Sequence, residues 1–195
     1  IFKTQLRAIY RASNYGNIKI MFPMISDIGE LREAKAVAAE VREELRKENI
    51  PFNENVELGI MVEVPSVAIH SEAFAKEVDF FSIGTNDLTQ YILAVDRGNK
   101  KISRMYNSFH PSVLRSIKNI ISAGHKNHIK VGMCGEFASD ERAVVLLLGL
   151  GLDEFSMSAS EVLKVKYLIR NTTLLEAQAL AEKVCNMKTI EDVYQ

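Results

Sequence analysis

Hydrophobic residues along this chain follow two periodicities, which alternate from one end to the other. Short runs of consecutive apolar residues are typical of strands that are buried on both faces. Such runs predict five strands, at residues 17–24, 56–64, 79–84, 131–134 and 154–157. Elsewhere, apolar residues recur every three or four positions, which is the spacing of one helical face. That spacing predicts helices at 27–45, 66–78, 111–121, 139–148, 158–169 and 173–184, and another near the start of the chain.

Polar residues indicate where several of these helices should begin. The spacing of a capping box occurs at Asp27–Glu30, Ser158–Glu161 and Thr173–Glu176. Ser139 is the predicted N-cap of the helix at 139–148, and Gly149 is predicted to end that helix. The long polar stretch 85–109 is predicted to be mainly loop, with a helical turn or two.

The alternation of strands with helices predicts a parallel sheet, because each crossover connection is long enough to hold a helix. Two architectures satisfy this pattern, a (β/α) barrel and an open doubly wound sheet. The sequence contains neither the glycine-rich dinucleotide fingerprint nor a Walker A sequence, so the usual sequence basis for nucleotide binding is missing.

Composition narrows the class of protein further. Hydrophobic residues make up 47% of the 195 residues, which is enough to build a core and excludes a disordered chain. The 24 basic and 25 acidic residues are balanced, so no electrostatic signature of nucleic-acid binding is present. No apolar run approaches the roughly 20 residues that a membrane-spanning helix needs. Cys134 and Cys185 lie far apart, and reduced thiols are expected.

Glu63 is the most informative single position because it interrupts an otherwise apolar predicted strand, IMVEVP at 60–65. A buried carboxylate without a partner would cost several kcal/mol or change its protonation. The sequence leaves two explanations open. Glu63 could meet a metal ion, an arginine or hydrogen-bond donors at a functional site, or it could belong to a structural salt bridge.

Other polar residues follow the predicted strands at the same edge, where parallel α/β folds bind ligands. Asn86 and Asp87 could simply form a turn or helix cap, but Asp87 with Glu63 would make an all-oxygen site suited to Mg²⁺. Cys134 could be a small buried hydrophobe, a nucleophile or a general acid. Arg97 could be a solvated loop residue or a clamp for phosphate or carboxylate.

Longer motifs around these residues resemble the phosphoenolpyruvate (PEP)-binding domain of PEP-utilising enzymes. They are MVEVP at 61–65, FFSIGTNDLTQY at 80–91 and GMCGE at 132–136. Within that family, LAVDRGN at 93–99 and GLDEFSMS at 151–158 favour a resemblance to enzyme I of the bacterial sugar phosphotransferase system. Pyruvate phosphate dikinase and PEP synthase are the alternatives within the same chemistry.

The resemblance implies a (β/α)8 TIM barrel, of which this chain would supply about strands 4–8 with their helices. It also implies roles for the strand-end residues. Glu63 and Asp87 would hold Mg²⁺, Asn86 and Arg97 would bind the phosphate of PEP together with Asp87, and Cys134 would protonate the methylene carbon as enolpyruvate becomes pyruvate.

The resemblance implies partners and an organisation as well. The phosphoryl group would pass to a histidine on another domain and then to a histidine phosphocarrier protein, in a cytoplasmic homodimer. None of the four histidines of this chain matches that acceptor. Residues 1–195 are therefore expected to be one partial domain that lacks the first barrel strands, their arginines and the phosphohistidine domain. An alternative of another class is a non-catalytic dimerisation module.

Overall fold

The computed structural model describes residues 1–194 and contains one parallel sheet of five strands. The strands are β1 (Ile20–Phe22), β2 (Leu58–Val62), β3 (Phe80–Gly84), β4 (Lys130–Cys134) and β5 (Glu154–Phe155). Each strand pairs with the next one along the chain, in the order β1-β2-β3-β4-β5. A doubly wound sheet reverses its strand order at a switch point, whereas a barrel does not. The unreversed order therefore selects the barrel-type fold, here as an open, incomplete barrel.

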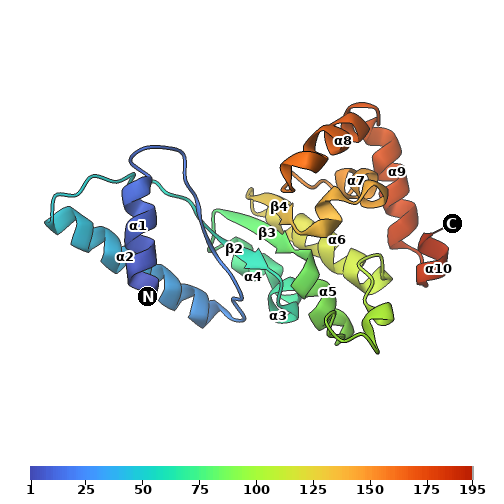
Figure 1. Ribbon diagram of the computed structural model, residues 1–195, viewed down its shortest axis with the longest axis horizontal. Helices are drawn as coiled ribbons and strands as arrows, with labels where there is room; N and C mark the ends of the chain where they lie inside the picture. The colour runs from blue at the N-terminus through green and yellow to red at the C-terminus, as the bar shows by residue number, and fades with distance from the viewer. Residues whose placement is uncertain (195) are drawn as a thin grey trace.

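Helices follow every strand, as the periodicity predicts. They are α1 (Phe2–Ala12), α2 (Ile28–Lys47), α3 (Pro65–Ile69), α4 (Ser71–Ala75), α5 (Thr85–Leu93), α6 (Pro111–Lys126), α7 (Glu141–Gly149), α8 (Ala159–Arg170), α9 (Leu174–Cys185) and α10 (Ile190–Val193), with 3₁₀ turns η1 (Ser103–Met105) and η2 (Glu136–Ser139). The α1–α2 pair lies at one end of the molecule and α7–α10 at the other, with the sheet between them (Figure 1). No helix within residues 1–194 is long and apolar enough to cross a membrane.

The two faces of the sheet differ in what covers them. Side chains alternate between faces along a strand, so one face takes Ile60, Ile83 and Met133, which are fully buried in the core beneath the helices. Burying each such side chain contributes about 1.5–3 kcal/mol. The other face, called the inner face below, presents residues such as Met61 and Ser82, which pair in register and are only partly buried. The inner face is the one that a closed barrel would enclose.

Two predictions of local structure differ from the structure. The predicted helix 66–78 is divided into α3 and α4, with His70 at the break. The stretch 85–109 is more helical than predicted because α5 occupies its first nine residues. Leu88 and Thr89 are fully buried in that helix, so tertiary packing outweighs the polar character of the segment.

The predicted helix caps have mixed outcomes. The Thr173–Glu176 capping box is formed in both directions. Ser139 is not the N-cap of α7, because Asp140 takes that place and accepts a hydrogen bond from the Arg142 amide. The Ser158 capping box is also wrong: Ser158 precedes α8, but its hydroxyl pairs with the Ser160 hydroxyl. At Asp27 the cap forms, while the Glu30 side chain bonds to Ser26 instead of Asp27.

Candidate functional site

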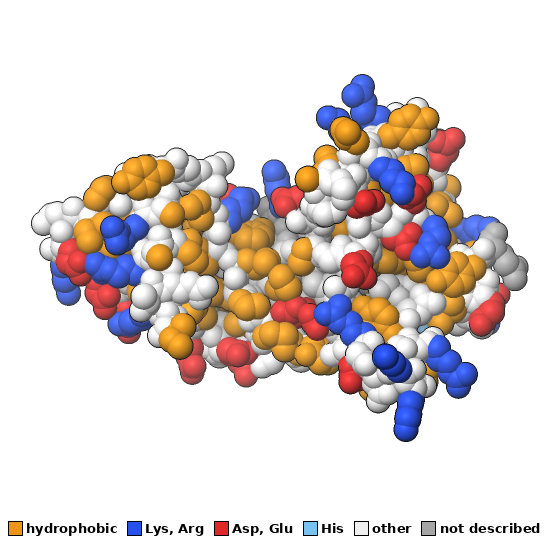
Figure 2. Space-filling model, in the orientation of Figure 1, with side chains coloured by type: hydrophobic (Ala, Val, Ile, Leu, Met, Phe, Trp, Pro, Cys, Tyr) orange, Lys and Arg blue, Asp and Glu red, His pale blue; other side chains and the backbone are white. Residues whose placement is uncertain are grey.

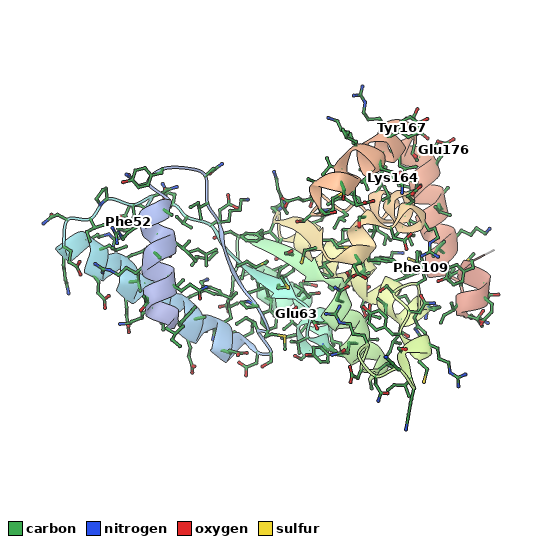
Figure 3. All side chains as sticks on the ribbon, in the orientation of Figure 1. Phe52, Glu63, Phe109, Lys164, Tyr167 and Glu176 are labelled. Atoms are coloured by element: carbon green, nitrogen blue, oxygen red, sulfur yellow. The ribbon has the colours of Figure 1, made fainter. Side chains whose placement is uncertain are left out.

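Glu63 lies immediately after β2, with its side chain 3% exposed, as the apolar run around it predicts. Its Oε1 accepts a hydrogen bond of 2.8 Å from the backbone N–H of Met24. Burial raises the pKa of Glu63, and the negative charge of Asp87 raises this pKa further, while the Met24 hydrogen bond acts in the opposite direction. The carboxyl therefore lacks a full complement of charge-stabilising contacts within the described residues. Figure 3 labels Glu63 beside the sheet and the short helices that follow β2.

The Met24 donor comes from a strained turn after β1. Met24 has a left-handed φ of 54°, which is unusual for a residue with a side chain. Such a conformation costs about 1–3 kcal/mol and persists only where surrounding structure imposes it. Here it accompanies an N–H that is directed at the buried carboxylate, so the strain coincides with the candidate site.

Glycine at position 84 creates the space that the Glu63 carboxylate uses. A Cβ added to Gly84 would lie 2.8 Å from Glu63 Oε2 and 2.9 Å from Met61 Sδ. Gly84 pairs in register with Cys134 on the next strand. Glu63, Gly84 and Cys134 therefore come from three neighbouring strand ends, and the acid and the thiol are separated by a residue without a side chain.

The first turn of α5 places the next pair of predicted residues beside the same edge. Asn86 and Asp87 are the second and third residues of α5, and both are partly buried. The hydroxyl of Thr85 donates to the Cys134 carbonyl at 3.3 Å, which ties the start of α5 to the end of β4. Gly135 has a φ of 107°, and a Cβ there would lie 2.8 Å from Thr85 Oγ1, so glycine is needed for this approach.

Cys134 is partly exposed and lines a cavity of about 340 Å³ together with polar groups. The residues around the cavity are Asn86, Gly135, Glu136, Ser139, Ser156, Met157 and Ser158. The Cys134 thiol donates a weak hydrogen bond to the Ile83 carbonyl at 3.7 Å. Both cysteines are free, as predicted.

Arg97 has no hydrogen bond or ion pair with the other predicted site residues in the described part of the chain. It lies exposed in the loop after α5, where its backbone N–H donates to the Gln90 side chain at 3.1 Å. Its guanidinium makes no ion pair with any residue in the described part of the chain. The phosphate-binding role of Arg97 therefore stays a prediction.

The donor set at this edge fits a hard divalent cation. Glu63 and Asp87 supply two carboxylates close enough for one to raise the pKa of the other. A buried carboxylate beside a second, partly buried one favours a nearby positive charge, and Mg²⁺ typically takes one or two carboxylates and leaves its other positions to water and phosphate. Residues 1–194 contain no cluster of three or more His, Cys, Asp or Glu residues that could enclose a metal ion. A metal ion held by Glu63 and Asp87 would therefore take its remaining ligands from water or substrate.

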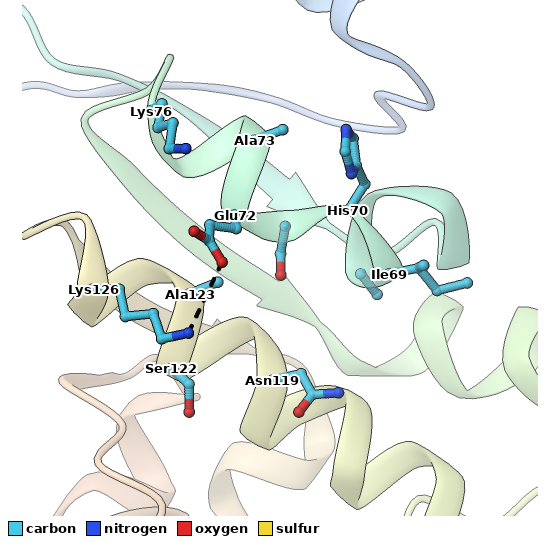
Figure 4. Close-up of a pocket in the computed structure, with 11 residues that line it drawn as sticks. Ile69, His70, Glu72, Ala73, Lys76, Asn119, Ser122, Ala123 and Lys126 are labelled. Atoms are coloured by element: carbon cyan, nitrogen blue, oxygen red, sulfur yellow. Dashed lines mark ion pairs between the residues drawn. The ribbon is translucent and has the colours of Figure 1, made fainter.

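A different cavity lies away from this edge, on the outside of the fold. It has a volume of about 520 Å³ and lies between the α3–α4 segment and α6 (Figure 4). Glu72 and Lys126 face each other across it at 3.9 Å, and His70 also lines it. None of the predicted site residues contributes to this cavity.

Sequence reasoning missed the residues that support the site. Met24 acts through its backbone N–H, Gly84 through its lack of a side chain, and Thr85 through its hydroxyl. No sequence motif on its own indicates these functions. Tyr106 was also missed, although its hydroxyl reaches the Asn86 carbonyl at 3.2 Å. The only available signal was position, because Gly84 and Thr85 directly precede the Asn86–Asp87 pair.

The unreversed parallel sheet, with carboxylates and a thiol at adjacent strand ends, defines a barrel-type α/β domain with an acidic strand-end site. A family model described as "PEP-utilising enzyme, PEP-binding domain" matches residues 1–174. The chain belongs to this family of PEP-utilising enzymes, as its motifs predict.

Individual relatives are similar over the whole chain. It is 54% identical over 195 residues to the phosphoenolpyruvate-protein phosphotransferase of Haemophilus influenzae, and 52% identical over 193 residues to that of Bacillus subtilis. These matches cover 100% and 99% of this chain but 34% of each relative, so the chain spans about a third of their length.

One solved structure resembles the fold. A citrate lyase from Burkholderia xenovorans LB400 has a TM-score of 0.65 and 17% sequence identity, covering 91% of this chain and 59% of that one. At this identity the likeness concerns the fold alone.

Proposed function

We propose that this chain is the C-terminal part of the PEP-binding barrel of a PEP-dependent protein phosphotransferase, and that it carries part of the PEP and Mg²⁺ site. The observation that supports this most strongly is identity above 50% to phosphoenolpyruvate-protein phosphotransferases across the whole chain. The first barrel strands and a phosphohistidine domain would lie elsewhere in the full polypeptide. The same similarity argues against the dikinase and synthase alternatives.

In this proposal, charge neutralisation at the strand ends prepares PEP for phosphoryl transfer. Glu63 and Asp87 hold Mg²⁺, which when bound neutralises charge on the phosphate and carboxylate of PEP. Asn86 and Arg97 bind the phosphate with Asp87. Phosphoryl transfer depends mainly on positioning and electrostatic stabilisation, so these residues need only bind and orient. The closeness of Asp87 to the buried Glu63 carboxylate, whose pKa it raises, supports the arrangement.

Cys134 supplies the acid in the second half of the reaction. Once the phosphoryl group has left, the enolate of pyruvate takes a proton at its methylene carbon, and the Cys134 thiol donates it. The resulting thiolate must recover a proton from solvent before the next cycle. Two observations support this role: the thiol lines an open cavity next to Asn86, and its hydrogen-bond partner is a carbonyl acceptor.

The phosphoryl acceptor in this proposal is a histidine outside the chain, which then serves a histidine phosphocarrier protein. Two of the histidines here have structural partners. His110 accepts a hydrogen bond from the Ser112 amide at the start of α6, and His125 lies 3.0 Å from Asp153. We assign neither of them to phosphotransfer. A cytoplasmic location, without nucleic-acid binding or membrane insertion, belongs to the same proposal.

A homodimer also belongs to this proposal. Large hydrophobic side chains are exposed at the α8–α9 end, including Leu163 (79% exposed) and Leu175 (78% exposed). In the space-filling view, hydrophobic side chains are visible at this end among basic and acidic ones (Figure 2). Exposed apolar surface of this kind favours association. Light scattering on the full polypeptide should report twice the monomer mass, and a monomer at micromolar concentration would exclude the dimer.

The proposed chemistry can be tested by phosphoryl transfer from PEP in the full polypeptide that carries this chain. The parent protein should phosphorylate a histidine phosphocarrier protein and release pyruvate, while the 195-residue chain alone should not. Cys134→Ala should lose most turnover but retain PEP binding, and Cys185→Ala, which removes the other free thiol, serves as the control. Unchanged turnover in Cys134→Ala would refute the proton-donor role. A parent protein that does not act on PEP would refute the function itself.

A further inference from the structure

A short segment between η1 and α6 holds the first turn of α5 from outside the sheet. This segment, residues 106–110, is called the strap below. The Tyr106 hydroxyl donates to the Asn86 carbonyl at 3.2 Å, and the Ser108 hydroxyl lies 3.1 Å from that of Thr89. Thr89 is fully buried, so the second contact is shielded from water. The strap therefore contacts α5 at two points about one helical turn apart. One is Asn86, which lines the candidate site, and the other is Thr89.

The opposite side of the strap is fixed by aromatic packing. Phe109 is 6% exposed, and its ring lies edge-on to Phe137 of η2, with centroids 4.9 Å apart. Its other neighbour is Tyr194, just after α10, at 5.4 Å. Asn107 of the strap also donates to the Tyr194 hydroxyl at 3.2 Å. Figure 3 labels Phe109 at the side of the molecule that carries α10.

The packing of Phe109 is reinforced by a charged pair. The Arg142 guanidinium lies 5.0 Å from the centre of the Phe109 ring, within the range of a cation–π contact. Asp140 binds that guanidinium at 2.5 Å, and this hydrogen bond lowers the pKa of Asp140. η2 begins two residues after Cys134, so the strap connects the Asn86 segment with the segment that follows the thiol.

Asn86 forms part of the wall between two cavities. One is the cavity lined by Cys134, and the other, of about 270 Å³, is lined by Asn86, Glu136 and most of the strap. Because the Asn86 side chain borders a cavity on two sides, few neighbouring atoms pack against it. Its position then depends on the backbone of the first turn of α5, which Tyr106 contacts from the strap.

We propose that Tyr106 is a positioning residue for the PEP and Mg²⁺ site, and that it acts by holding the Asn86 carbonyl. The inference rests on the proposed function, in which Asn86 and Asp87 bind phosphate and metal. Loss of the hydroxyl lets the first turn of α5 move, which weakens both interactions together. Cys134 lies on β4, not on α5, so the protonation step is affected less than ligand binding is.

The test compares Tyr106→Phe with Tyr91→Phe in the full polypeptide that carries this chain. Tyr91 is on the same helix and is 41% exposed, and its hydroxyl makes no hydrogen bond within the described residues, so it serves as the control. A neutral hydrogen bond of this kind corresponds to about a two- to tenfold effect on binding. Tyr106→Phe should therefore raise the KM for PEP by about two- to tenfold, with a smaller change in kcat.

A second measurement does not depend on turnover. Calorimetric titration with Mg²⁺ alone should show weaker binding by Tyr106→Phe within the same range, and unchanged binding by Tyr91→Phe. Ser108→Ala, which removes the other contact between strap and α5, should shift the KM and Mg²⁺ affinity in the same direction. It also provides an independent variant if Tyr106→Phe does not fold.

The outcomes separate the positioning role from its alternatives. A lower melting temperature with unchanged KM and unchanged Mg²⁺ affinity would show that Tyr106 is only structural, and would overturn the proposal. Equal effects from Tyr106→Phe and Tyr91→Phe would overturn it as well. If the unsubstituted parent protein were inactive toward PEP, the proposed function would be refuted. That result is distinct from any difference between the Tyr106 and Tyr91 variants.

Discussion

Replacing Glu63 with glutamine should stabilise the metal-free chain at neutral pH. The side chain is buried, and both its burial and the charge of Asp87 raise its pKa. The folded protein therefore disfavours the charged form of this carboxyl. Glutamine has nearly the same shape and retains an oxygen that can accept the Met24 hydrogen bond, so the substitution removes the charge and little else.

The size of this gain follows from the proton affinity of the carboxyl. Each tenfold increase of that affinity on folding raises the pKa by one unit and lowers the free energy of unfolding by about 1.4 kcal/mol once the group is ionised. For a domain of this length, that corresponds to about 3–6 °C in melting temperature. A raised pKa in the folded state means that stability is lost as the pH rises from the unfolded pKa through the folded one. The advantage of Glu63→Gln should therefore grow as the pH rises above the ordinary glutamate pKa of 4.5, and it should disappear below that pKa.

Thermal unfolding between pH 4 and pH 8 without divalent metal measures this difference. Glu33→Gln, at an exposed position on α2, is the matched control and should leave the melting temperature unchanged at every pH. Added Mg²⁺ should stabilise the parent chain more than Glu63→Gln. The reasoning would be wrong if Glu63→Gln were no more stable than the parent at pH 7, or if its advantage persisted at pH 4.

Four further substitutions test other parts of the structure. Gly149→Ala should destabilise the α7–α9 contact by more than the 1–3 kcal/mol typical of overpacking, since a Cβ there would lie 1.9 Å from the Ala177 carbonyl oxygen; urea unfolding would measure it. Thr173→Ala should cost about 1 kcal/mol through loss of its cap, while Ser158→Ala should cost little, and equal losses would contradict the assigned caps. Gly84→Ala should weaken Mg²⁺ binding in calorimetry by displacing the Glu63 carboxylate, and unchanged affinity would argue against Glu63 as a ligand.

The sequence predicted the architecture well because the fold depends on repeated local patterns. The apolar run that contains Ile60 has the composition of a strand buried on both faces, and the structure buries it as β2. The spacing of Val113, Leu114 and Ile117 likewise predicts the buried face of α6. The choice between a barrel and a doubly wound sheet depended on strand order, which the periodicity of one chain does not encode.

The site was predicted only where residue type itself carries chemistry. Glu63 and Cys134 are unusual in their apolar surroundings, and the structure brings both to one edge of the sheet. The Met24 amide and the Tyr106 hydroxyl reach that edge through loops, whose paths depend on tertiary packing. Ser139 and Ser158 show the same limit on a smaller scale, since several nearby polar residues could serve as caps and only packing decides between them.

The strand order has a consequence for how the chain reaches its folded state. Every strand pairs with its neighbour in the sequence, so each new pairing closes a loop only as long as one connecting segment. Because the entropy cost of loop closure grows only slowly with loop length, it stays moderate at each step. Parallel pairings of this kind still form more slowly than the local contacts within a helix. The sheet can form by adding one strand and its helix at a time, because each added strand has an unpaired edge to which the next strand can bind. An insertion in the loop between α5 and α6 should then slow the addition of β4 to β3 and leave the β1–β2 pairing unaffected.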